Sequence, residues 1–319
     1  MCYSAMVWAD YRQYVKQFNS KLSILEFVEL FRRRAQGDKV SIPKGMEAAF
    51  AEPHNEDERS IHAMITAFAA AESTRLEQEL FGQRTRLVEA ERKLQVKPTK
   101  AGTDSQRIAS NKIARAMVTL ADLRRADSKD SDSRIYPGNY ARVMVMEDGQ
   151  CVIKPMRYQC RPAGKPTFYD EKYPGTYNAR RDNLEGFWKG QFGHTHGIMV
   201  VNAFYENVNL HRSEGRELRD SEEVRNAVLE FKPRPTQNMV VACLWSRWSG
   251  PGEPDLLSFA AITDEPPPEV SQAGHDRCIV PFQPDNINAW LNPDPANLKA
   301  QYAILDDRER TYYEHRLAA

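Results

Sequence analysis

A forty-residue stretch without proline is the feature that most constrains this chain. From Asp57 to Val96 the sequence is rich in charge and contains a single glycine, Gly82. Its apolar residues recur every three or four positions, which predicts one long helix with a narrow apolar stripe. The stripe consists of Ile61, Met64, Ile65, Phe68, Ala69, Leu76, Leu80, Leu87 and Leu94. A stripe this narrow suits contact with a second helix.

That second helix follows a break. The polar segment KPTKAGTDSQ interrupts the pattern, and Ile108, Ile113, Met117, Leu120 and Leu123 then mark a returning helix. We expect the two helices to form an antiparallel hairpin. Two interpretations of the stripe stay open. It packs within the hairpin, or it provides a docking surface for a protein partner or for a second copy of the chain.

Beyond Tyr136 the sequence changes to short β-prone stretches separated by turns. YARVMVM, EDGQ and CVIKPMRY predict a hairpin, and GIMVVNAFYENV, NMVVACLWSRW and LLSFAAITDE each contain a further strand. INAWLNP and the final LKAQYAILDDRERTYYEHRLAA favour helix. We therefore expect an α+β protein in which residues 1–20 and 135–319 form a β-rich core and residues 21–134 form a helical insertion.

The overall charge is balanced, with 44 basic and 44 acidic residues. DNA binding would therefore need a local basic patch, because the whole molecule offers no attraction to a polyanion. The five cysteines, at positions 2, 151, 160, 243 and 278, are scattered and include no CxxC pair, which indicates a reducing cytoplasm. The sequence contains no export signal and no run of eighteen apolar residues, so we expect no membrane span.

Cys2 directly follows the initiator methionine. Removal of Met1 would place a free α-amine and a thiol on neighbouring carbons, and such groups titrate near about 7.7 to 8.0 and about 8.5. This 1,2-aminothiol can form an imine with an aldehyde through nitrogen and then close a thiazolidine ring through sulfur. The alternatives are an N-terminal nucleophile for acyl transfer and a thiol that packs as a small hydrophobe.

Two further segments carry polar residues that suit recognition or proton transfer. Asn178, Arg180 and Arg181 lie in a polar turn, where an amide and guanidinium groups can bind phosphate and sugar oxygens. His275 begins the His-Asp-Arg segment, and histidine is the side chain best suited to proton transfer at neutral pH. Each segment is equally consistent with an ordinary charged surface turn.

Glu206 ends an apolar strand and is a candidate proton carrier, since burial favours the neutral form of a carboxyl group. It could instead pair with an arginine at the edge of the sheet. Strict alternation places Val201, Ala203 and Tyr205 on one face of this strand, and Asn202, Phe204 and Glu206 on the other. His194 and His196 could bind a metal, but no other ligands lie at tight spacing, so we expect no metal site.

Taken in order, these segments resemble the SRAP family, the SOS-response-associated peptidase proteins that include sensors of abasic sites in single-stranded DNA. The matching motifs are Met1-Cys2, Asn178-Ala179-Arg180, Phe204-Tyr205-Glu206 and His275-Asp276-Arg277. The chain departs from the family at Tyr3-Ser4, where Gly-Arg is usual. The resemblance implies a core of barrel-like antiparallel sheets with flanking helices, and it leaves the 21–134 insertion unexplained.

The resemblance also implies an activity, namely a thiazolidine crosslink between Cys2 and an abasic site that protects the lesion in the DNA damage response. Asn178 would position Cys2, Glu206 would move protons at the amine and imine, and His275 would move protons on the opening sugar. The implied DNA contacts are Arg180, Arg181, Arg277, Arg157 and Trp188. The implied partner is single-stranded DNA, with no cofactor, in the cytoplasm or at the nucleoid of a bacterium. An autoproteolytic N-terminal thiol peptidase and a non-covalent DNA-binding protein remain alternatives.

Overall fold

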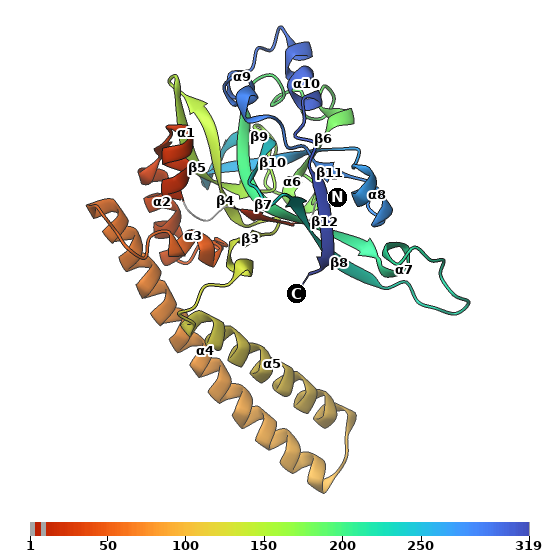
Figure 1. Ribbon diagram of the computed structural model, residues 1–319. Helices are drawn as coiled ribbons and strands as arrows, with labels where there is room; N and C mark the ends of the chain where they lie inside the picture. Colours follow the sequence, from red (N-terminus) through yellow and green to blue (C-terminus); the bar gives the residue numbers. More distant parts are fainter. Residues whose placement is uncertain (1–3, 8–10, 319) are drawn as a thin grey trace. The chain divides into compact units, whose positions relative to one another are not determined.

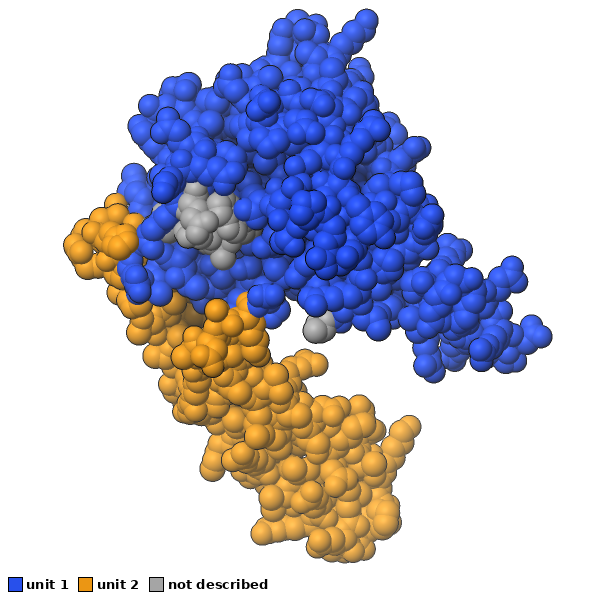
Figure 2. Space-filling model, viewed as in Figure 1, with its two compact units in different colours: residues 1–30, 39–52, 130–319 blue, residues 31–38, 53–129 orange. Residues whose placement is uncertain are grey.

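The computed structural model describes residues 4–7 and 11–318. The chain packs into two units, residues 1–30, 39–52 and 130–319 in the first and residues 31–38 and 53–129 in the second (Figure 2). The α+β class is confirmed, because a large mixed sheet with flanking helices occurs together with a helix of 41 residues. Residues 21–30 and 39–52 belong to the unit that contains the sheet, and the expected division into a core and an insertion stays a prediction.

The first unit contains all the described strands and most of the short helices (Figure 1). The strands are β1 Ser4–Val7, β2 Lys21–Leu22, β3 Arg134–Ile135, β4 Tyr140–Glu147, β5 Gln150–Tyr158, β6 Asn178–Arg180, β7 His196–Asn209, β8 Asn226–Arg234, β9 Met239–Gly250, β10 Glu253–Asp264, β11 Cys278–Ile279 and β12 Tyr312–Leu317. The helices are α1 Tyr11–Phe18, α2 Ile24–Ala35 (which enters the second unit at Phe31), α3 Lys44–Ala48, α6 Tyr169–Lys172, α7 Leu210–Ser213, α8 Pro268–Gln272, α9 Ile287–Leu291 and α10 Leu298–Asp306.

Five strands close into a ring, in the order β10, β5, β4, β7 and β9, with β9 returning to β10. Each strand sends side chains into one core cluster, as Val143, Met156, Met199, Cys243 and Phe259 do. The ring agrees with the expected barrel-like core. Its pairings are not all antiparallel, however, since β5 lies parallel to β10. Outside the ring, β6 also lies parallel to β10 and β2 lies parallel to β5. Long connections between these strands permit the parallel arrangement.

The predicted hairpin of β4 and β5 is confirmed. Asp148 and Gly149 at its turn have φ angles of 50° and 74°. Both lie in the left-handed region that a type I′ turn requires, and Asp-Gly is a favoured sequence for that turn.

β7 contains a bulge beside β1. Met6 pairs with Ala203 and Val7 with Val201, so Asn202 is an extra residue on β7. The bulge moves Val201 into the same core cluster as Phe204, so the strict alternation predicted for Val201 is wrong. Beyond the bulge alternation resumes, and Glu206 shares the core face of its neighbours Phe204 and Val208.

The end of the chain also differs from expectation. The helix predicted there ends at Asp306, and Tyr312–Leu317 forms β12 antiparallel to β8. Tyr312 and Tyr313 are β-prone residues, and β8 offers an unpaired edge for the segment to join. Pairing with a distant strand therefore overrides the local preference for helix.

The second unit contains a pair of long helices that we call the arm, α4 Glu56–Val96 and α5 Lys100–Arg124 (Figure 1). The long helix predicted over this stretch is confirmed, and Asn55 caps it by accepting a hydrogen bond from Glu58 N at 2.9 Å. Leu76 and Leu80 of α4 are buried against Ala116 of α5. Arg86 bonds Ser105 whereas Arg124 bonds Ser73, so the two helices run antiparallel. None of the described helices is long and apolar enough to cross a membrane.

Candidate functional site

Glu206 and His275 meet inside the first unit. His275 Nε2 lies 3.3 Å from Glu206 Oε2, and the two side chains are 8% and 0% exposed. His275 Nδ1 lies 2.8 Å from the carbonyl oxygen of Arg277. A carbonyl can only accept, so Nδ1 carries the proton and Nε2 faces the carboxyl group. The pair can therefore hold one proton between two buried atoms and pass it on.

Burial is the main influence on the protonation of His275. It lowers the pKa of His275 below the ordinary value, and the bond to the Arg277 carbonyl acts in the opposite direction. The imidazole is therefore neutral over more of the pH range, as a proton acceptor must be. Cys278 lies nearby, and its burial together with the charge of Glu206 raises the pKa of its thiol well above the ordinary value.

The end of β10 brings two of the sequence motifs together. β6 pairs with Ala261–Thr263 along one side of β10, and β11 pairs with Thr263–Asp264 after the His275 segment. The electrostatics agree with this placement. Asp182, which is hydrogen-bonded to Arg180, raises the pKa of that guanidinium, and Asp276 adds to the effect. The Asn-Ala-Arg and His-Asp-Arg segments thus form one surface around the last residues of β10.

Asn178 is a buried amide at this surface, only 5% exposed. Neither Oδ1 nor Nδ2 has a hydrogen-bond partner among the residues that the structure describes. A buried amide without partners costs about 1 to 3 kcal/mol. The side chain is therefore suited to accept and donate hydrogen bonds to a polar group that enters the site.

β1 begins beside Glu206. Ser4 pairs with Tyr205, the residue before Glu206, and β1 runs antiparallel to β7. Ser4 is fully buried and accepts a hydrogen bond of 2.9 Å from Arg134, whose guanidinium lies 3.6 Å from the centre of the Tyr205 ring. The predicted nucleophile Cys2 lies outside the described residues. The position of Ser4 is nevertheless fixed by contacts on both sides.

A cavity of about 500 Å³ opens at His275. Its wall includes Asp276, the helical segment that precedes His275, and the connection between β7 and β8. Arg212 of α7 lies in this wall, is exposed, and forms no ion pair with the described residues. Sequence reasoning missed Arg212, because a single arginine in a polar connection has no distinguishing pattern. The cavity gives the buried pair a route to solvent beside an available cation.

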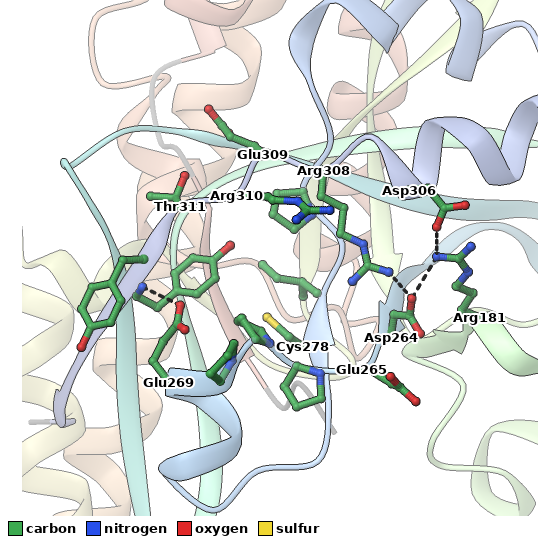
Figure 3. A pocket seen from close by; sticks show the side chains of 17 residues that line it. Arg181, Asp264, Glu265, Glu269, Cys278, Asp306, Arg308, Glu309, Arg310 and Thr311 are labelled. Atoms are coloured by element: carbon green, nitrogen blue, oxygen red, sulfur yellow. Dashed lines mark hydrogen bonds and ion pairs between the residues drawn. The ribbon is translucent and has the colours of Figure 1, made fainter.

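A second cavity, of about 700 Å³, is lined by both residues of β11 and by residues 308–313 (Figure 3). Arg181 lies at one edge of it and pairs with Asp264 at 3.1 Å and with Asp306 at 2.6 Å, and Arg308 also binds Asp264. These carboxylates neutralise both arginines. The wall is therefore less suited to a phosphate than the cavity at His275.

The remaining predicted DNA contacts lie in different environments. Arg180 is exposed and hydrogen-bonded to Asp182, and Arg277 is half-buried. Arg157 pairs with Asp170 at 2.8 Å, which satisfies its charge within the protein. Trp188 is only 3% exposed and packs edge-on against Phe187. The structure thus gathers Asn178, Arg180, Glu206 and His275 near the end of β10, and it engages Arg157, Arg180 and Arg181 in ion pairs.

His196 is a structural residue. Its Nε2 accepts a hydrogen bond of 2.8 Å from Gly193 N, and its Nδ1 lies 3.1 Å from the carbonyl oxygen of Trp290. The imidazole also packs on the Trp290 ring, with 3.9 Å between centroids. Burial lowers the pKa of His196 to about 3. With both nitrogens bonded to backbone, the ring has none left for a metal.

Comparison with known proteins gives one family. A family model described as SOS response associated peptidase (SRAP) matches residues 101–316, which include Asn178, Glu206 and His275 but not Cys2. Two similar solved structures are proteins from Bordetella bronchiseptica (14% identity, TM-score 0.46, 61% of this chain and 90% of that one) and from Bacteroides thetaiotaomicron (10%, 0.45, 59% and 78%). A third is a phage-related protein from Bordetella bronchiseptica (18%, 0.43, 58% and 81%). No curated protein matches the chain.

Proposed function

The chain belongs to the SRAP family, and from this premise we propose that it captures abasic sites in single-stranded DNA through a covalent bond to Cys2. Family membership supports a function associated with abasic sites. The observation that carries the covalent chemistry is the buried Glu206–His275 pair, placed beside the first described residue of β1.

Covalent geometry limits the distance from that strand to Cys2. A chain spans at most about 3.6 Å per residue. Cys2 is two residues from Ser4, so their Cα atoms are at most about 7 Å apart. Ser4 lies opposite Tyr205, and Glu206 follows directly. We propose that the amine and thiol of an N-terminal Cys2 act at the Glu206–His275 pair, which this length of chain permits.

The other cysteines are poor nucleophiles. Cys160, Cys243 and Cys278 are buried, and burial raises the pKa of each thiol, to about 12 for Cys160. Burial also raises the pKa of Cys151, which is partly exposed on β5. A thiol reacts as its thiolate, so these environments disfavour attack on an electrophile. Cys2 is the cysteine left to carry the chemistry.

The proposed reaction between Cys2 and the abasic site has three steps. His275 takes the proton from the C1′ hydroxyl of the sugar and delivers it to the ring oxygen as the C1′–O4′ bond breaks, which gives the open-chain aldehyde. The Cys2 amine attacks the aldehyde carbon, and one of its protons passes to the carbonyl oxygen to give a carbinolamine. Glu206 then supplies a proton to the leaving hydroxyl and recovers the second proton from nitrogen, so that water departs and an imine forms. The Cys2 thiol then adds to the imine carbon while its proton passes to nitrogen, which closes the thiazolidine. One water molecule leaves overall.

Other residues would orient the reactants. The Asn178 amide would bond the amine end of Cys2, which supplies the partners that it lacks among the described residues. Arg212 in the wall of the cavity and Arg180 at the end of β6 would bind phosphates flanking the lesion, since both side chains are exposed. Arg180 would have to exchange its contact with Asp182 for the phosphate.

The test is adduct formation on an abasic single-stranded oligonucleotide. We expect the purified protein to form an adduct that survives denaturing electrophoresis, and we expect Cys2→Ala to abolish it. Cys151→Ala is the matched control, because it removes the most exposed of the described thiols and should leave the adduct intact. Mass spectrometry of the protein should show that Met1 has been removed.

An adduct that persists in Cys2→Ala would overturn the proposal, as would a retained Met1 on protein that is fully active. Cys2-dependent cleavage of a peptide in the absence of DNA would favour the thiol peptidase instead.

A further inference from the structure

The arm, taken here with its flanking residues as 53–129, has two parts of opposite charge. We call residues 84–115 the tip, and residues 53–83 and 116–129 the base. The tip has nine basic residues against three acidic ones, whereas the base has five basic against eight acidic. The basic residues of the tip are Arg84, Arg86, Arg92, Lys93, Lys97, Lys100, Arg107, Lys112 and Arg115. The chain as a whole has no net charge, but the tip of this helical hairpin has a net charge of +6.

The two parts also differ in how their cations are paired. Four of the five basic residues of the base, Arg59, Arg75, Arg124 and Arg125, form ion pairs with acidic side chains of the arm. In the tip, Arg107 lies 3.6 Å from Asp104 and Arg86 bonds Ser105. The other seven are exposed and form no ion pair with any described residue. Their charges are therefore available to an external partner.

The rest of the molecule carries no comparable excess of positive charge. The first unit contains 27 basic and 32 acidic residues, and the second contains 17 basic and 12 acidic. Long-range attraction of a polyanion to this chain must therefore come from the second unit. Within that unit the tip has six more basic than acidic residues, whereas the whole unit has five more, so the tip accounts for all of the positive excess.

We propose that the tip binds the phosphate backbone of double-stranded DNA. Single-strand binders stack bases on aromatic side chains, and residues 84–115 contain no Phe, Tyr or Trp. Duplex DNA presents one phosphate charge per about 1.7 Å of axis and needs no stacking surface. The thirteen residues from Arg84 to Val96 extend for about 20 Å, a length equal to about six base pairs.

This duplex binding goes beyond the proposed function, because it requires neither Cys2 nor a lesion. It is a contact with phosphates and carries no sequence information. Its affinity should fall steeply with salt, because each phosphate contact releases condensed counterions. The arm would thus hold the protein on duplex DNA while the chemistry takes place on a single strand.

The test compares two variants of the full chain with the same loss of four positive charges. The tip variant is Arg84→Gln, Arg92→Gln, Lys93→Gln and Lys112→Gln. The base control is Arg59→Gln, Arg75→Gln, Arg124→Gln and Arg125→Gln. Glutamine keeps a high helix propensity, and helical circular dichroism would verify that both variants fold. The probe is a labelled, lesion-free duplex of about 20 base pairs, titrated over a series of salt concentrations.

We expect the tip variant to reduce the slope of log affinity against log salt by about 3 to 4, at about 0.9 for each phosphate that the variant no longer neutralises. The base control should keep the slope of the unmodified protein. Equal effects of the two variants would overturn the proposal, and so would a larger loss on a single strand of the same length than on the duplex.

Adduct formation on a short abasic single strand separates this proposal from the proposed function. The tip variant should form that adduct normally, and Cys2→Ala should bind the duplex normally. Failure of the adduct with intact duplex binding would remove the crosslinking function and leave the role of the arm standing.

Discussion

The sheet unit and the arm use charge in opposite ways. Glu206 and His275 are almost completely buried, with 3.3 Å between Oε2 and Nε2, so the pair is suited to proton transfer. Seven cations at the tip of the arm are exposed and form no ion pair within the described chain. Burial shifts the pKa of an ionisable side chain, so the function of such a group depends on pH. An exposed cation can bind an external anion, and that interaction is screened by salt. The comparison separates the region suited to chemistry from the region suited to attraction.

We expect the largest effect on activity when the buried carboxyl group of Glu206 is removed. Glu206→Gln keeps the shape of the side chain but cannot accept or release a proton. We expect single-turnover adduct formation to slow by about 10² to 10⁴-fold, the range typical of a lost general acid or base. The measurement is the rate of adduct appearance on an abasic single strand under denaturing electrophoresis.

Glu230→Gln is the matched control. Glu230 lies on the neighbouring strand, is 4% exposed, and bonds Tyr205 Oη rather than His275. We expect its rate to stay within about twofold of the unmodified protein, since it takes no part in proton transfer. Equal slowing of both variants would assign the effect to loss of structure and contradict the role of Glu206.

The sensitivity of the sheet unit to pH can be tested at His196. The pKa of His196 falls from 6.5 to about 3 in the folded protein, mainly through burial. Between those values the unfolded chain binds more protons than the folded one, so the free energy of unfolding decreases as pH falls. The contribution is about 1.4 kcal/mol per pH unit, or about 2.7 kcal/mol by pH 4.5. In His196→Gln the free energy of unfolding should decrease less as pH falls, by this amount. Urea unfolding at several pH values would measure it.

The absolute stability of His196→Gln will also change, so only its slope against pH is informative. A slope identical to that of the unmodified protein would show that His196 does not stay neutral in the folded state.

The arm should respond to loss of apolar packing rather than to pH. Leu80 is 8% exposed and packs in the cluster with Leu76 and Ala116. We expect Leu80→Ala to destabilise the arm by about 2 kcal/mol, at the low end for a buried leucine. Thermal loss of helical circular dichroism would measure it. Val118→Ala is the control, because Val118 is 71% exposed and its truncation should change little. Neither variant should alter adduct formation.

The smallest effect is expected at the base of the arm. Arg75 pairs with Glu72 at 2.6 Å and with Glu79 at 3.4 Å, but its side chain is 57% exposed. Exposed ion pairs contribute little, so Arg75→Gln should cost about 0.5 kcal/mol or less in helical stability. A cost several times larger would mean that the base depends on its charge network as strongly as the site depends on burial.

Local sequence predicted the elements whose signals are local. The Asp148-Gly149 turn specified the β4–β5 hairpin, and the regular stripe from Ile61 to Leu94 specified α4. It failed where a distant strand decided the outcome, as in the C-terminal segment that forms β12 on the edge of β8. The β7 bulge at Asn202 likewise depends on pairing with β1, almost two hundred residues away in sequence.

The candidate site shows the same division. Residue types and their order singled out Asn178, Glu206 and His275, but not their distances or their burial. Arg180 and Arg181 carried the same sequence signal. Only the fold shows that Arg180 pairs with its neighbour Asp182, whereas Arg181 pairs with the distant Asp264 and Asp306. Arg212 carried no signal, and only the cavity at His275 reveals its position.

By itself, the sequence determined the helical arm, the α+β class and the family motifs, because periodicity, turn chemistry and residue order are properties of short segments. The tertiary structure alone decided which charges are buried and which remain open. Glu206 and His275 lie 69 positions apart and meet because β7 and β10 belong to one closed ring, with β11 paired at the end of β10. Burial and pairing arise between distant segments, and no local pattern encodes them.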